Sequence, residues 1–154
     1  YYQSDLNGDG IIGGPEASHN TQYGDPEIES SFDQILTGNH RRNKLKAKKQ
    51  SAELYGMAGS DKLIGSPYSD WLDGGAGNDK LIGKKGADIY VLSDGNDLIK
   101  GFKVSESDIF LIAADTSYTL RQAGKNTLFV HSSGQTVFKR MSEDELLESI
   151  IINE

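Results

Sequence analysis

The chain has 154 residues, a net charge of −7 and no cysteine, so disulfide bonds cannot hold it together. Only 36% of its residues are hydrophobic and 18 are glycine, a composition that argues against a large conventional core. No apolar run is long enough to span a bilayer, so we expect no membrane span.

The first element is an acidic, glycine-rich loop near the amino terminus. Residues 5–16 match D-x-[DN]-x-[DN]-G-x5-E at all twelve places and resemble an EF-hand or dockerin-type calcium loop. The resemblance implies one calcium ion held by Asp5, Asn7, Asp9, the Ile11 carbonyl and Glu16. Because Gly13-Gly14-Pro15 cannot continue a helix, we expect a lone loop rather than an EF-hand pair. The alternative is an acidic linker.

We expect residues 1–31 to hold this loop and an irregular linker, and residues 32–55 to form degenerate coils that cap a repeat. In the second segment a leucine returns every nine residues, at Leu36, Leu45 and Leu54. The same segment carries six cations: Arg41, Arg42, Lys44, Lys46, Lys48 and Lys49. They either protect an open sheet edge or form a patch for an anionic partner such as an acidic glycan or a cell surface.

The nine-residue period continues through residues 56–101 and gains a second feature. The inward apolar positions are Leu63, Leu72, Leu81, Tyr90 and Ile99. Two places before each of them stands an aspartate: Asp61, Asp70, Asp79, Asp88 and Asp97. Glycines at the first, second and fourth places permit tight turns, and each x-L-x triplet predicts a short strand with one inward side chain. A period of this kind predicts stacked turns.

The unit at residues 74–82 reads GGAGNDKLI, the complete G-G-x-G-N-D-x-L-x form. The segment resembles the RTX (repeats-in-toxin, hemolysin-type) calcium-binding nonapeptide repeat. This resemblance implies an all-β fold, a right-handed parallel β-roll or β-solenoid. In that fold two nonapeptides complete one coil, so that units n and n+2 stack.

Stacked carboxylates repel one another by about 3 kcal/mol at about 5 Å and an effective dielectric constant near 20. Ca²⁺ bound by carboxylate and carbonyl oxygens would remove this repulsion. We expect about three ions, at Asp61/Asp79, Asp70/Asp88 and Asp79/Asp97. The resemblance adds seven turn glycines as ligands: Gly56, Gly59, Gly74, Gly77, Gly83, Gly86 and Gly95. The alternative is that the aspartates only form turns.

Residues 102–154 predict a β-rich cap with one short helix. Strands are expected at residues 108–114, 119–122, 127–131 and 135–140. Ser142 begins a capping box, which predicts a helix from Glu143 to about Ser149. Four apolar residues would face the strands: Leu146, Leu147, Ile150 and Ile151. This order resembles the carboxyl-terminal end of proteins exported by type I secretion, whose export signal lies in the last few dozen residues.

The sequence contains no H-E-x-x-H, G-x-S-x-G or Walker A motif and no cysteine nucleophile, so we expect no enzyme here. Because the chain begins at Tyr1 without an initiator methionine, we expect a piece of a longer protein whose catalytic activity, if it has one, lies upstream. An acidic chain without interleaved aromatic residues predicts no nucleic-acid partner.

The sequence therefore predicts a domain that folds on extracellular Ca²⁺ and stabilises a larger secreted or cell-surface protein. The resemblance adds a role in export through type I secretion machinery. One alternative is a calcium-dependent module for an acidic polysaccharide or cell surface, adhesin-like or similar to the R-modules of alginate epimerases. A further alternative is calcium-triggered self-cleavage at Asp25-Pro26, although that bond follows the calcium loop here and precedes it in the family.

Overall fold

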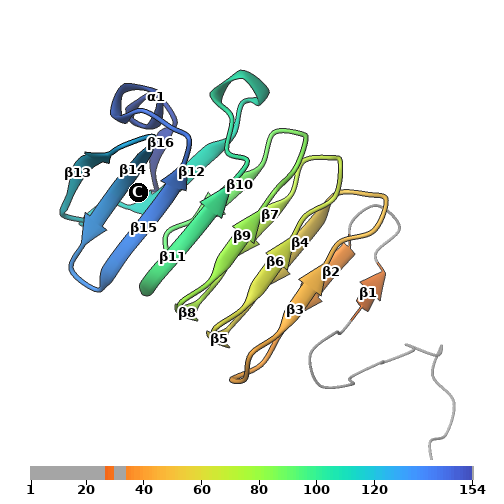
Figure 1. Cartoon of the computed structure of the whole chain (residues 1–154). Helices are drawn as coiled ribbons and strands as arrows, with labels where there is room; N and C mark the ends of the chain where they lie inside the picture. Colours follow the sequence, from red (N-terminus) through yellow and green to blue (C-terminus); the bar gives the residue numbers. More distant parts are fainter. Residues whose placement is uncertain (1–26, 30–33, 154) are drawn as a thin grey trace, which may run out of the picture.

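The computed structural model describes the backbone of residues 27–29 and 34–153, with side chains from residue 34 onward. The expected calcium loop at residues 5–16 and the Asp25-Pro26 bond lie outside the described residues. The described chain winds through two facing sheets, and Figure 1 shows the successive coils side by side. The predicted parallel β-roll is confirmed.

Sheet A has seven strands in the order β1-β2-β4-β7-β10-β12-β16. Their bounds are Glu27–Glu29, Gln34–Thr37, Ala52–Tyr55, Trp71–Asp73, Ile89–Val91, Ile109–Ala113 and Ile150–Asn153. All neighbours pair in parallel except β1, which pairs antiparallel with β2. Leu36, Leu54, Leu72 and Tyr90 lie opposite one another in register, so n to n+2 stacking is confirmed.

Sheet B also has seven strands, in the order β13-β14-β15-β11-β9-β6-β3. In that order their bounds are Tyr118–Ala123, Asn126–His131, Gly134–Lys139, Gly95–Lys100, Lys80–Ile82, Lys62–Ile64 and Lys44–Lys46. Leu45, Leu63, Leu81 and Ile99 follow one another in parallel register. The short strands β5 (Ala58–Gly59) and β8 (Ala76–Gly77) pair within the turns.

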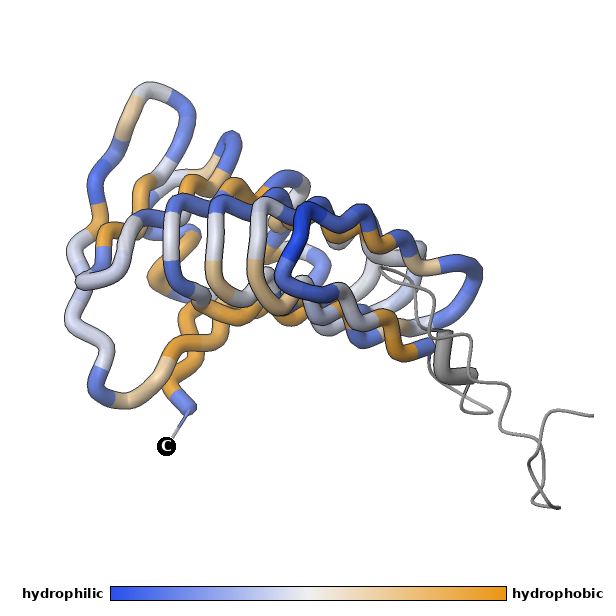
Figure 2. The backbone as a smooth tube through the Cα atoms, turned by 90° about the horizontal axis from the view of Figure 1, so that it is seen from below, coloured by the Kyte–Doolittle hydropathy of each residue, from blue (hydrophilic) through white to orange (hydrophobic). Residues whose placement is uncertain are grey.

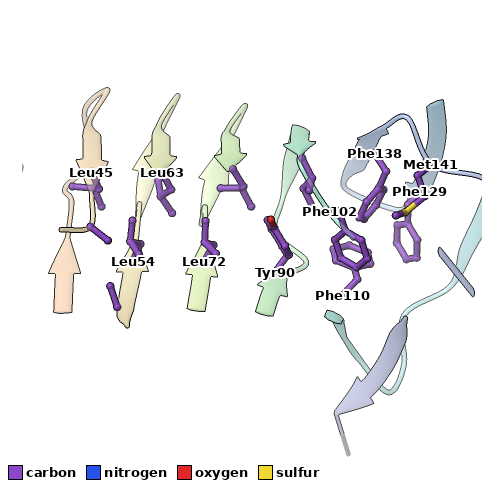
Figure 3. Packing of buried hydrophobic residues seen from close by; sticks show 14 of the residues in the cluster. Leu45, Leu54, Leu63, Leu72, Tyr90, Phe102, Phe110, Phe129, Phe138 and Met141 are labelled. Carbon is purple, nitrogen blue, oxygen red and sulfur yellow. The ribbon is translucent and has the colours of Figure 1, made fainter. Parts of the chain in front are cut away.

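The core is one row of inward side chains between the sheets. The eight apolar residues of the nine-residue period, from Leu36 to Ile99, are at most 1% exposed. Figure 3 shows the leucines in file, followed by the aromatic rings of Tyr90, Phe102 and Phe110. Phe110 packs edge-on against Phe129 and Phe138 at centroid distances of 5.0 and 4.9 Å. These larger rings lie at the end of the roll where antiparallel strands join sheet B.

The turns form two rows along the roll. We call the turns that precede sheet B strands the first edge: residues 38–43, 56–61, 74–79 and 92–97. Those that precede sheet A strands are the second edge: residues 47–51, 65–70, 83–88 and 101–108. Because the apolar residue of each strand points inward, the residue two places earlier also points inward, at the mouth of its turn.

The far end differs in part from the expected antiparallel cap. Strands β12 and β15 continue sheets A and B in parallel, so the roll extends beyond residue 101. Only β13 and β14 form the expected antiparallel arrangement, with β15 as their third strand. The coil that joins β10 to β12 holds the 3-10 helix η1 (Val104–Glu106) and is 20 residues long, measured between Asp88 and Asp108.

The helix α1 runs from Glu143 to Leu147 and begins with the predicted Ser142 capping box. The expectation that four apolar residues face the strands is wrong for two of them, since Leu147 is 51% and Ile151 46% exposed. Ile151 is exposed because residues 150–153 form β16 at the edge of sheet A, whose hydrophobic colour stands out in Figure 2. Leu147 is the last residue of α1, in which Leu146 is the buried residue. No helix of the described part is long and apolar enough to cross a membrane.

Candidate metal centre

The structure brings the predicted aspartates into two rows. Asp61, Asp79 and Asp97 lie on the first edge, and Asp70 and Asp88 lie on the second. Each of the five is at most 3% exposed. Burial of an ionised carboxylate is unfavourable unless hydrogen bonds or a cation compensate it, so the partners of each oxygen decide what the rows can do.

One oxygen of each aspartate joins neighbouring coils. On the first edge, Asp61 Oδ1 accepts the Asn43 N–H at 2.6 Å, and Asp79 Oδ1 accepts the Asp61 N–H at 2.7 Å. Asp97 Oδ1 continues the series by accepting the Asp79 N–H at 2.9 Å. The second edge repeats the pattern from Ala52 N–H to Asp70 and from Asp70 N–H to Asp88. These bonds link coils rather than close a local turn, so turn formation alone does not explain the aspartates.

The other oxygen is without a partner at three positions. Within the described chain, the Oδ2 atoms of Asp61, Asp79 and Asp88 are buried and accept no hydrogen bond. Buried polar atoms are seldom left in this state unless a ligand or ion completes them. Three buried carboxylate oxygens are therefore available to a cation.

Glycine keeps the space beside these oxygens open. A Cβ at Gly56 would lie 2.8 Å from Asp61 Oδ2, and one at Gly74 would lie 2.5 Å from Asp79 Oδ2. The Gly74 carbonyl oxygen also faces Gly56, so carboxylate and carbonyl oxygens share the same small space. Such hard oxygen donors are the ligands that Ca²⁺ prefers, and the residues on the first edge therefore fit this ion.

Side-chain carboxylates alone cannot complete a site. No group of three or more His, Cys, Asp or Glu side chains converges in the part of the chain that the structure describes. An ion bound here would therefore also require main-chain carbonyls, such as those of the turn glycines. The first-place glycines Gly56, Gly74 and Gly83 are buried beside their aspartates. The fourth-place glycines (Gly59, Gly77, Gly86 and Gly95) have φ between 104° and 147° and contact the coil before their own.

Burial controls the charge of the row aspartates Asp79, Asp88 and Asp97. Burial raises the pKa of Asp79 to about 7, and the neighbouring carboxylates of Asp97 and Asp61 add to the rise. Burial likewise raises the pKa of Asp88 to about 8 and that of Asp97 to about 6. Without a cation, Asp88 and part of Asp79 hold a proton at neutral pH, whereas Asp97 is mostly ionised there.

This charge balance predicts how the metal-free chain responds to pH. The folded-state pKa values lie above those of an unfolded aspartate, so their contribution to stability is fully present below about pH 4 and is lost as pH rises through about 6 to 8. Far-UV circular dichroism of calcium-free protein should show more β-structure at pH 5 than at pH 8.5. Equal spectra at the two pH values would contradict this assignment.

The expected Asp70/Asp88 pair is not equivalent to the first-edge pairs. Asp70 Oδ2 accepts the Ser66 N–H at 2.6 Å, and its Oδ1 accepts the Ser66 hydroxyl at 3.1 Å in addition to the Ala52 N–H. Both Asp70 oxygens are therefore already bonded by the protein. Asp97 Oδ2 is likewise bonded, at 2.9 Å from the Ser93 hydroxyl.

Sequence reasoning missed a sixth aspartate of the series. Asp108 is 3% exposed, and its Oδ1 accepts the Asp88 N–H at 2.9 Å. It stands two places before the inward Phe110, as the others stand before their apolar residues. The longer coil displaced it from the nine-residue period, and this local spacing was the only sequence signal that could have identified it.

The six cations, predicted either to protect a sheet edge or to form a patch for an anionic partner, are distributed around the first coils. Arg41 and Arg42 are exposed on a first-edge turn, whereas Lys48 and Lys49 are exposed on the second edge. Lys44 and Lys46 project from the outer face of β3, which is the terminal strand of sheet B. The position of β3 supports an edge-protecting role for these lysines.

The fold is a parallel β-roll, and its two rows of buried carboxylates present oxygen donors of the kind that calcium prefers. Residues 55–90 match the family model described as the RTX calcium-binding nonapeptide repeat, in four copies. The chain therefore carries RTX calcium-binding nonapeptide repeats, and the resemblance noted in the sequence is confirmed. Repeats of this family bind calcium.

A solved structure shares the fold beyond the matched repeats. The crystal structure of the extracellular lipase LipA from Serratia marcescens is similar with a TM-score of 0.67 and 20% sequence identity. The similarity covers 84% of this chain and 24% of that chain, so this chain spans about a quarter of the lipase. No curated protein matches the sequence.

Proposed function

We propose that this chain folds on extracellular calcium and stabilises a larger secreted or cell-surface protein, assisting its export by a type I secretion system. It has no catalytic role of its own in this proposal. The observation that carries it is the set of three buried, unpartnered Oδ2 atoms at Asp61, Asp79 and Asp88, each next to a first-place glycine. These atoms favour three calcium positions in the roll, and the amino-terminal loop would add one.

Linkage explains how such positions control folding. At low calcium the buried carboxylates must be protonated or repel one another, and the glycine-rich turns lose much conformational entropy on folding. A ligand that binds only the native state stabilises it by RT ln(1 + [L]/Kd), about 2.7 kcal/mol per site at 100 times Kd. Millimolar calcium outside the cell would therefore fold the roll after export.

Comparison of calcium with magnesium tests this proposal. Ca²⁺ should raise the Tm of the full chain strongly, whereas Mg²⁺ at the same concentration should raise it little. The reason is that Mg²⁺ requires near-octahedral geometry and retains its water ligands. Equal stabilisation by the two ions, or by neither, would refute a calcium-specific function.

A row of lysines favours a second function, the binding of an acidic polysaccharide. Lys44, Lys62 and Lys80 lie opposite one another on β3, β6 and β9, at the strand spacing of about 4.8 Å. The charges of Lys100 and Lys62 lower the pKa of Lys80, which places Lys100 beside the same row. Regular positive charge along a flat sheet complements a linear polyanion.

The lysine row leads toward a basic hollow at the far end of sheet B. The hollow has a volume of about 680 Å³ and is lined by Lys100, Lys125, Lys139 and Arg140. Lys103 also lines it but forms an ion pair with Glu106 at 2.6 Å. The lysine row and the hollow together extend the basic surface beyond the six cations that the sequence analysis considered as a patch.

Charge removal in the row tests the second function. The double variant Lys62→Gln, Lys80→Gln should bind alginate about tenfold more weakly at low salt, because each exposed ion pair contributes roughly 0.2–1 kcal/mol. Lys85→Gln, an exposed position on the second edge, is the matched control and should bind as the wild type does. Affinity chromatography at increasing salt measures the difference, and unchanged retention of the double variant would exclude the lysine row.

A further inference from the structure

The turn at residues 65–70 holds its carboxylate differently from the turns at residues 56–61 and 74–79. Asp61 and Asp79 each have one buried oxygen without a partner in the described chain. Asp70 has none, since Ser66 bonds both of its oxygens. Ser66 stands where the complete repeat has its second glycine, Gly75, and is fully buried.

A lysine from the following coil is directed to the same turn. Lys84 also stands in the second place of its repeat, and its ammonium group donates a hydrogen bond to the Gly65 carbonyl oxygen. Gly65 is the first-place glycine of the turn that holds Asp70, and main-chain carbonyls of first-place glycines are the donors that accompany the carboxylates on the first edge. The carbonyl that corresponds in position to that of Gly74 is the Gly83 carbonyl, which lies next to Gly65. An ammonium group therefore bonds a carbonyl of the kind that a metal ion would take.

The backbone of Lys84 adopts an energetically unfavourable conformation in this turn. Its φ is 93°, in the left-handed region, close to the 76° of Gly75 at the same place of the complete repeat. Bulky residues seldom adopt this region, which costs of order 1–3 kcal/mol. Lysine thus keeps the turn conformation of the glycine that it replaces, while its side chain supplies a positive charge.

The positive charge of Lys84 acts on the Asp70 carboxylate in this turn. Burial raises the pKa of Asp70, and the Ser66 and Ala52 hydrogen bonds together with the Lys84 charge oppose that rise. The ammonium group of Lys84 is therefore close enough to act on the Asp70 carboxylate. Lys85, the next residue, is exposed and contacts neither group among the described hydrogen bonds.

We propose that the Lys84 ammonium and Ser66 together replace a calcium ion at the residue 65–70 turn, so that this coil is closed without metal. The Asp70 side of the expected Asp70/Asp88 site does not fit that ion, whereas the unpartnered Asp88 Oδ2 remains available to an ion in its own turn, so the roll would combine metal-bound and lysine-bound turns. The inference rests on the proposed calcium function at Asp61, Asp79 and Asp88.

Ion counting tests the proposal on the full chain. The variant Ser66→Gly, Lys84→Gly restores glycine at both second places and should bind one more Ca²⁺ per chain than the wild type in equilibrium dialysis with metal analysis. Lys85→Gly is the control and should bind the wild-type number. If the wild type binds calcium and the double variant binds the same number, this proposal is overturned while the proposed function stands. If the wild type binds none, both fail.

A second measurement needs no variant. In calcium-loaded wild-type protein, Lys84 should react with an amine-acetylating reagent about tenfold more slowly than Lys85, since one charge-assisted hydrogen bond supports protection of that size. Mass spectrometry of the labelled peptides resolves the two lysines. Equal rates would overturn the proposal even if the double variant failed to fold.

Discussion

Replacement of Asp79 by Asn should raise the calcium concentration required for folding at least about tenfold, which corresponds to roughly 1.4 kcal/mol. Asp79 lies in the middle of the first edge, where it bonds Asp61 on one side and Asp97 on the other. Asn retains an oxygen for the Asp61 N–H but removes the buried charge, which is the part available to a cation. A calcium titration followed by far-UV circular dichroism measures the shift.

The same variant should have the opposite effect without calcium. Because burial raises the pKa of Asp79 to about 7, ionisation of the wild-type carboxylate opposes folding above that pH. Asp79→Asn should therefore leave the calcium-free chain at least as stable at pH 8.5. Asp115→Asn, at an exposed residue outside the aspartate rows, is the control and should change neither property. If Asp79→Asn destabilised both forms equally, the carboxylate would have a purely structural role.

Replacement of Gly77 by Ala should destabilise the calcium-bound roll by about 2–6 kcal/mol, combining backbone strain with overpacking. Gly77 has φ 147°, and a Cβ there would clash with the Gly59 carbonyl, with the carbonyl carbon at 2.7 Å. Gly77 in turn contacts Gly95 in the next coil, so the clash lies in the middle of a continuous stack. Denaturant unfolding in saturating calcium gives the free energy of unfolding.

Gly124→Ala separates the two causes of this effect. Gly124 has φ 63° in the β13–β14 turn, and nothing lies within 4 Å of a Cβ built there. Its replacement should cost only the backbone term, about 1–2 kcal/mol. Similar losses for the two variants would show that close contact between coils does not limit the fourth place of the repeat.

The fold could be predicted because one period encodes several levels of structure. A residue such as Leu72 marks the inward position of a strand, and Asp70, two places earlier, marks the mouth of its turn. With 18 residues per coil, this spacing also determines which strands pair and which aspartates share an edge. Local pattern, register and core therefore follow from the same residues.

Beyond residue 101 the period no longer carries this information. Two extra residues before Asp108 shift it out of phase, although its hydrogen bond to the Asp88 N–H continues the row. Phe138 pairs in register with Ile99, although the β13–β14 hairpin separates the two residues in the sequence. Because this insertion interrupts the nine-residue period, the sequence pattern predicts a simple antiparallel cap instead of further coils.

The state of each carboxylate could not be predicted from spacing. Asp61 and Asp70 occupy the same place in their repeats, yet only Asp61 keeps an unpartnered oxygen. The difference depends on the Ser66 N–H, which bonds Asp70 Oδ2, and the ammonium group of Lys84 reaches the same turn from the following coil. Such contacts depend on side-chain conformation, which a nine-residue pattern does not specify.

Far-UV circular dichroism of the wild-type chain, first in excess chelator at pH 8 and then with increasing Ca²⁺, tests calcium-dependent folding most directly. The buried, unpartnered oxygens of Asp61, Asp79 and Asp88 predict a largely unfolded spectrum in chelator and a cooperative gain of β-structure at millimolar calcium or below. A β-sheet spectrum in chelator that calcium leaves unchanged would contradict this account.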